Sequence, residues 1–184
     1  MKNKNNILQN QIAKESIFTA LMILMEQKGF KEITITELTE KAGVSRMAFY
    51  RNYNQMEEVI SNYLMEYFEV YSNQILTKES FDTYESARLY FACFRKQEKL
   101  ISNLIQSNLT NLLFESNIQF FHTLFKNICE DACSSTKQKY YAEFIAGGFY
   151  KVLIEWAKNG MEESDTDMAR FINTLNINKA VTFV

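Results

Sequence analysis

The stretch from residue 33 to residue 53 reads ITITELTEKAGVSRMAFYRNY, and its polar residues divide it into two short helical segments. Thr34 stands three residues before Glu37. In this arrangement the hydroxyl and the carboxylate each accept a hydrogen bond from a backbone N–H that has no partner at the start of a helix. We therefore expect a helix over residues 35–42.

A single glycine and a serine set the turn and the start of the next helix. Gly43 can take the positive φ that ends a helix, and Ser45 can cap a helix over residues 46–52. The pattern predicts a tight helix, turn and helix. The apolar residues expected to hold the two helices at a fixed angle are Leu38, Ala42, Val44, Phe49 and Tyr53.

The opposite side of the second helix is expected to face solvent, where the start of a recognition helix can enter a DNA major groove. Arg46 is the best base reader, because an arginine can bond bidentately to guanine. Met47 and Ala48 offer apolar contacts, for example to a thymine methyl group. The residues on or beside this side are Ser45, Arg46, Met47, Ala48, Tyr50, Arg51 and Asn52.

The stretch resembles the helix-turn-helix of the TetR family of bacterial transcriptional regulators. Members place a Thr-capped helix, an Ala-Gly-Val-Ser turn and an aromatic ending at this spacing. The resemblance implies a three-helix DNA-binding head over residues 1–53 and a helical ligand-binding and dimerisation body over residues 54–184. It also implies that five residues address phosphates or flanking bases, namely Thr34, Thr36, Tyr50, Arg51 and Asn52.

Three positions depart from the family pattern. Met47 stands where glycine or proline is frequent, and Asn52 stands where histidine is usual. Met56 replaces a basic residue at the start of the fourth helix, which removes one expected phosphate contact.

Composition gives the fold class. The 184 residues include no proline and only five glycines, which favours long helices and predicts an all-α protein.

Residues 1–53 carry eight Lys or Arg and five Asp or Glu, a formal charge of +3, whereas residues 54–184 carry 12 Lys or Arg and 17 Asp or Glu, a formal charge of −5. A basic head on an acidic body suits a DNA reader.

The apolar periodicity predicts the remaining helices. The first helix is expected to start near residue 7 and to end at Gly29, with Lys28 beside its last carbonyls. Asn54 and Glu57 are expected to cap a fourth helix that reaches about residue 75. Five more are expected over 82–96, 98–107, 109–133, 137–158 and 164–176, with Asp82 and Ser164 as caps.

Other residue patterns favour no catalytic or metal site. His122, Cys129 and Cys133 share one face of a predicted helix, where core packing is the preferred interpretation over a thiol sensor or metal site. No nucleophile motif or Gly-rich phosphate loop is present, so we expect neither an enzyme nor a bound cofactor. Three cysteines make no disulfide framework, and no segment is long and apolar enough to span a membrane, so a cytoplasmic location is expected.

The function favoured by the sequence is a ligand-responsive repressor that binds a palindromic operator as a homodimer. The aromatic-rich helices from about residue 82 to 158 suggest a small apolar or aromatic effector. Residues 140–156 also resemble the penultimate helix of the dihydroxyacetone-kinase regulators of the same family, whose last two helices form the dimer. The alternative is a coactivator or adaptor of the same fold that acts through a partner protein and binds DNA weakly.

Overall fold

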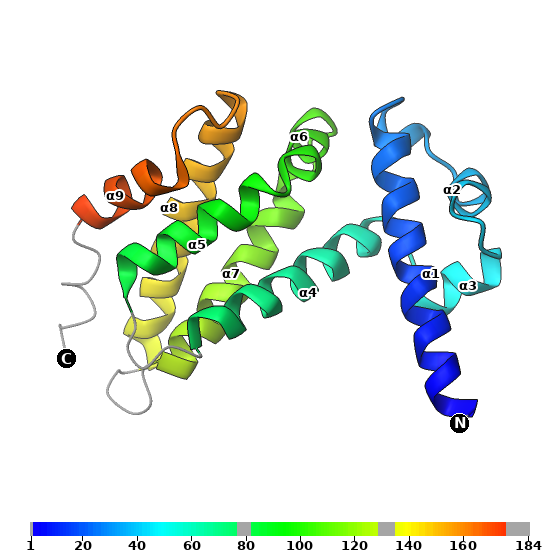
Figure 1. Cartoon of the computed structure of the whole chain (residues 1–184), viewed down its shortest axis with the longest axis horizontal. Coiled ribbons are helices and arrows are strands. Elements are labelled where there is room, and N and C mark those ends of the chain that lie inside the picture. Colours follow the sequence, from blue (N-terminus) through cyan, green and yellow to red (C-terminus); the bar gives the residue numbers. More distant parts are fainter. Residues whose placement is uncertain (1, 77–81, 129–134, 176–184) are drawn as a thin grey trace.

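The computed structural model describes residues 2–76, 82–128 and 135–175, and every regular element in those ranges is a helix (Figure 1). The all-α prediction is confirmed. The helices are α1 (Lys2–Met25), η1 (Phe30–Glu32, one 3-10 turn), α2 (Ile35–Ala42), α3 (Arg46–Asn52), α4 (Glu57–Leu76), α5 (Thr83–Arg95), α6 (Glu98–Gln106), α7 (Thr110–Ile128), α8 (Ser135–Lys158) and α9 (Asp165–Thr174).

The head consists of α1, α2 and α3, which lie together at one end of the molecule (Figure 1). Leu38 and Phe49 are fully buried between these helices, and Tyr53 is nearly so. Burial raises the pKa of Tyr53 to about 12, so its phenol stays neutral near pH 7. Ala42 and Val44 are half-buried against the same core. The predicted apolar residues therefore do join the two helices.

The first helix differs from the prediction at both ends. It begins at Lys2 rather than near residue 7, and it ends at Met25 rather than at Gly29. Gly29 has extended backbone angles, φ −60° and ψ 140°, and precedes η1. The Lys28 ammonium lies 3.0 Å from the carbonyl oxygen of Glu32, so it does not cap the last carbonyls of α1. A nearby carboxylate and carbonyl outcompete those carbonyls for this cation.

Helix α4 leaves the head and runs into the body (Figure 1). The residue that caps its start is Glu58 rather than the predicted Glu57: the Asn54 backbone N–H donates to the Glu58 carboxylate over 2.8 Å. Met56, just before the helix, is 8% exposed and belongs to the core. The buried side of α4 consists of Val59, Ile60, Leu64, Phe68, Tyr71 and Ile75.

The body is made of α5 to α9 around the far part of α4. Helix α7 packs along α4 and α8, and α9 packs along α5. Asp82 and Ser164 cap α5 and α9 as predicted, accepting from the backbone N–H groups of Glu85 and Asp167 over 3.2 and 3.1 Å. The described part of α7 ends at Ile128, and α8 begins at Ser135 rather than at residue 137.

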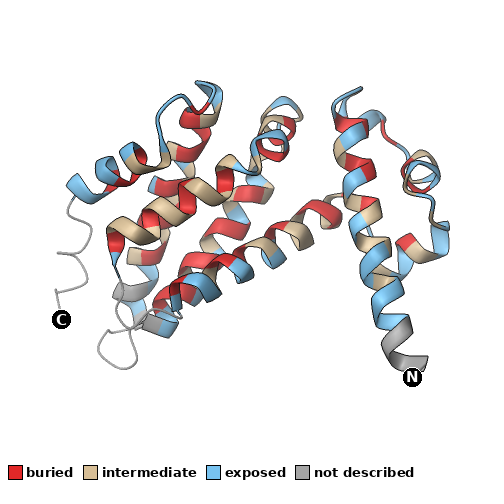
Figure 2. Cartoon of the chain, viewed as in Figure 1, coloured by how far each residue is buried: buried red, intermediate tan, exposed pale blue. Residues whose placement is uncertain are grey.

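Aromatic rings fill the interior of the body, and residues of α4, α5, α7 and α8 are coloured as buried there (Figure 2). Tyr90 is fully buried and lies 4.9 Å, centroid to centroid, from Phe149 and 4.8 Å from Phe94. A small apolar cavity beside Tyr71 and Phe121 measures about 30 Å³. That space holds on the order of one or two water molecules. Most of the aromatic residues are therefore core; Phe144 is exposed, and Phe81 lies outside the described residues.

None of the described helices is long and apolar enough to cross a membrane.

Candidate nucleic-acid interface

Helix α3 presents its first turn to solvent at the surface of the head. The Ser45 hydroxyl accepts from the Ala48 backbone N–H over 3.1 Å, which fixes where the helix starts. Arg46 follows the cap and is exposed, and Met47 is 76% exposed. An exposed apolar side chain of this size on a short capped helix suits contact with a base edge.

The threonines of α2 lie at the other helix start of the motif. The Thr34 hydroxyl accepts from the Glu37 backbone N–H over 3.2 Å, as the sequence predicts, and both Thr34 and Thr36 are exposed. Tyr50, half exposed, and Arg51, exposed, lie one turn along α3. The structure thus brings seven of the nine predicted DNA-contacting residues to the surface: Thr34, Thr36, Ser45, Arg46, Met47, Tyr50 and Arg51.

The other two predicted residues are half-buried. Ala48 faces partly into the head, and the Asn52 amide nitrogen donates to the Ala48 carbonyl and to the Asn10 side chain, each over 2.9 Å. Asn52 therefore fastens the end of α3 to α1. Sequence reasoning missed Asn10, since nothing local links residues 42 positions apart.

The turn between α2 and α3 is built on a left-handed residue. Gly43 has φ 67° and ψ 28°, and its N–H donates to the Glu40 carbonyl over 3.1 Å. The Val44 N–H reaches back to the Thr39 carbonyl over 3.0 Å. These two bonds satisfy carbonyls left over at the end of α2 and turn the chain sharply into α3.

An ion pair holds the base of the motif. The Lys28 ammonium lies 2.5 Å from the Glu37 carboxylate, and this hydrogen bond lowers the pKa of Glu37 below its usual 4.5. The positive charge of Lys28 is therefore paired with the Glu37 carboxylate. The basic residues of the motif that stay exposed are Lys41, Arg46 and Arg51, and Lys31 just before it is exposed as well.

Three contacts set the position of the head on the body. The Phe18 and Tyr63 rings stack with centroids 3.6 Å apart, and the Lys14 ammonium lies 3.2 Å from the Glu66 carboxylate. The buried Asn103 amide on α6 donates to the Met22 carbonyl on α1 over 3.2 Å. The orientation of α3 therefore depends on α4 and α6.

The metal interpretation gains no support from the described residues. The His122 ring nitrogen Nε2 lies 3.1 Å from the Glu143 carboxylate, whereas Cys129 and Cys133 lie outside the described residues. Within the described ranges no group of three His, Cys, Asp or Glu side chains could hold a metal ion.

Comparison with known families gives two matches. A family of bacterial regulatory proteins, the tetR family, matches residues 17–62, and a transcriptional regulator C-terminal region of TetR type matches residues 82–178. The second match covers more than half of the chain. Among curated protein sequences, none matches.

Several solved structures share the fold. Lin0861 from Listeria innocua is 19% identical with a TM-score of 0.78, over 92% of this chain and 91% of that one. A putative TetR-family transcriptional regulator from Syntrophomonas wolfei is 17% identical with a TM-score of 0.69, over 95% and 98%. The dihydroxyacetone kinase operon activator DhaS is 14% identical with a TM-score of 0.65, over 93% and 97%.

Proposed function

The chain belongs to the TetR family of transcriptional regulators, which bind DNA and are not enzymes, and we propose that it is a ligand-responsive repressor that binds a near-palindromic operator as a homodimer. The observation that carries the proposal is the exposed first turn of α3, capped by Ser45 and led by Arg46. A recognition helix of seven residues reads too few base pairs alone to find one site in a genome. Two heads, one from each subunit, remove this limit.

We assign different roles to the two exposed arginines of α3. Arg46, in the first turn, reads a base edge, with Met47 and Ala48 supplying apolar contacts. Arg51, in the last turn, bonds a phosphate, as do the hydroxyl groups of Thr34, Thr36, Ser45 and Tyr50. Asn52 takes no phosphate in this proposal, because its amide nitrogen already donates to Ala48 and Asn10. The head over residues 1–53 is the DNA-binding unit, and residues 54–184 form the body. Because a bacterial operator lies in the cytoplasm, we propose that the protein acts there.

Selection from a random duplex library tests this assignment. The protein should enrich a near-palindrome, and Arg46→Ala should relax one base preference at a cost of about 1–3 kcal/mol. Arg51→Ala should weaken all sequences alike and flatten the salt dependence. A library without enrichment at low salt would remove the DNA-reading proposal, and uniform weakening by both variants would remove the role of Arg46.

The last two helices supply the dimer surface in this proposal. Both expose large apolar side chains: Tyr140 and Phe144 on α8, and Phe171 on α9 with Leu175 directly after it. Such side chains favour burial against a second copy. Gly147→Arg should split the proposed dimer, because no heavy atom lies within 4 Å of the added Cβ and the new charge would extend into the space that the proposed partner occupies. A dimer that persists in sedimentation would place the interface elsewhere.

A second candidate is a coactivator or adaptor that acts through a partner protein. Three observations favour it. The interior of the body is filled with rings, and the similar DhaS protein is described as an operon activator. The buried Met56 also leaves the start of α4 without a cation for a phosphate. Transcription from a selected operator in a purified system separates the two, since a repressor lowers it alone and a coactivator raises it only with a partner.

A further inference from the structure

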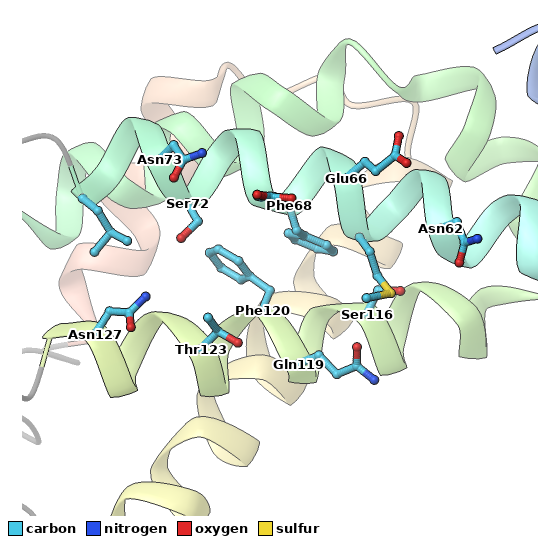
Figure 3. A pocket seen from close by; sticks show the side chains of 13 residues that line it. Asn62, Glu66, Phe68, Ser72, Asn73, Ser116, Gln119, Phe120, Thr123 and Asn127 are labelled. Atoms are coloured by element: carbon cyan, nitrogen blue, oxygen red, sulfur yellow. The ribbon is translucent and has the colours of Figure 1, made fainter. Parts of the chain in front are cut away.

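An open groove lies on the body between α4 and α7 (Figure 3). It measures about 480 Å³, within the range of about 300–1,000 Å³ typical of small-molecule sites. Phe68 and Phe120 form its floor, with stacked rings 4.9 Å apart, and Met65 lies beside them. Side-chain amides from both helices, among them Asn73 and Gln119, stand along its edges.

The charged side chains that line this groove are acidic. Glu66 and Glu69 of α4 line it, and none of its described lining residues is a lysine or an arginine. Glu69 is exposed and has no ion-pair partner within the described ranges of the chain. Glu66 is paired with Lys14 of α1, so among the described residues Glu69 is the groove carboxylate without a neutralising cation. An apolar floor beside an unpaired carboxylate complements a ligand that is both apolar and positively charged.

We propose that the effector of this regulator is an organic cation with an aromatic or aliphatic body, bound in the α4–α7 groove. The inference rests on the proposed function, because it names the class of effector that a ligand-responsive repressor of this kind would bind. It adds a positive charge to the small apolar or aromatic effector expected from the sequence, and it moves that effector to the groove, since the rings fill the interior and leave a cavity of only about 30 Å³.

The groove is connected to the head through Glu66. A neighbouring cleft of about 420 Å³ between α1 and α4 shares Asn62 and Glu66 with the groove. In that cleft Glu66 holds Lys14 of α1. A cation in the groove competes with Lys14 for the same carboxylate and so loosens the head from α4. A ligand that prefers the loosened state lowers operator affinity, and the operator lowers ligand affinity by the same factor.

The first test compares two probes of equal shape and opposite charge. Tetraphenylphosphonium should bind the full-length protein in isothermal titration, and its affinity should fall as salt is added. Tetraphenylborate should not bind at the same concentrations. Equal binding of the two ions, or no binding of the cation, would overturn the proposal.

Variants on the groove and off it locate the site. Met65→Lys places a positive charge in the groove at an exposed position, and Val70→Lys is the matched control, because Val70 is an equally exposed apolar residue of α4 that does not line the groove. Met65→Lys should abolish tetraphenylphosphonium binding and Val70→Lys should leave it unchanged. Glu69→Gln should weaken binding about fivefold, the usual upper effect of one exposed charge. Equal effects of the two lysine variants would refute the site.

The coupling is tested with the operator selected as described above. Tetraphenylphosphonium at saturation should weaken operator binding about two- to fivefold, the range expected for one exposed ion pair, and Glu66→Gln without ligand should weaken it similarly. Cation binding without any effect on operator affinity would refute the effector role. Operator binding in the absence of any ligand tests the proposed function separately, so the groove can fail while the DNA-binding proposal stands.

Discussion

The head and the body of this protein present their binding surfaces in opposite ways. In the head, short capped helices present exposed side chains such as Arg46 and Met47, which we propose contact DNA. In the body, the aromatic side chains that suggest a ligand chamber pack against one another around Tyr90 instead. Hydrogen bonds within a few residues are enough to form a surface that binds a large, rigid partner. A hollow interior, in contrast, loses van der Waals contacts between side chains, so an empty chamber is less stable than a packed core.

The largest expected effect comes from breaking the head core. Phe49→Ala removes a fully buried ring and should destabilise the head by about 3–5 kcal/mol. Operator binding should be lost, while thermal unfolding followed by circular dichroism should keep a separate transition for the body. A single early transition with loss of all helical signal would show that the two regions unfold as one unit.

A body variant serves as the control for that experiment. Asn117 is fully buried and its amide donates to the Ala146 carbonyl over 2.8 Å, while its oxygen accepts from the Tyr90 hydroxyl. Asn117→Ala should destabilise the body by about 2 kcal/mol, because it leaves buried polar groups unpaired. Operator affinity at 25 °C should stay unchanged.

Two glycines sharpen the comparison with effects of opposite sign. Gly43 has φ 67°, so Gly43→Ala should destabilise the head by about 1 kcal/mol even though no atom lies within 4 Å of the added Cβ. Gly148 is exposed inside α8, also with free space, so Gly148→Ala should stabilise the protein by about 0.5–1 kcal/mol. Chemical denaturation measures both, and equal signs would contradict the conformational argument.

The smallest effect is the pH dependence of the Lys28 and Glu37 pair. Its hydrogen bond lowers the folded-state pKa of Glu37 below 4.5, so the stabilisation is present above that value and is lost as the pH falls through the folded pKa. Lys28→Gln should lower the melting temperature of the head slightly at pH 7. The difference from the unsubstituted protein should shrink as the pH falls below 4.5, and a difference that does not shrink would show that the ion pair is not its cause.

Helix starts were the most predictable part of the fold. Thr34, Ser45, Asp82 and Ser164 each accept the predicted backbone hydrogen bond. A cap of this kind is formed within three residues, so short-range sequence contains all of its partners. Where a second partner lies close, the pattern misleads: Asn54 pairs with Glu58 rather than Glu57, and Lys28 pairs with Glu37 rather than with the end of α1.

Contacts between distant residues could not be predicted in this way. The bond from Asn52 to Asn10 and the bond from Asn103 to Met22 join residues 42 and 81 positions apart. They determine how α3 lies on α1 and how α1 lies on the body. No periodicity or cap pattern specifies such pairs, because they follow from the packing of whole helices.

The sequence by itself determined the helices, the turn at Gly43 and the family, because caps, apolar periodicity and a positive φ are short-range properties of the chain. Only the tertiary structure decided that the aromatic rings fill the body rather than line a chamber. It also brought Glu66 into contact with Lys14 and placed the acidic groove between α4 and α7. Close packing distributes side chains between core and groove across several helices at once, so the outcome depends on neighbours that are remote in the chain.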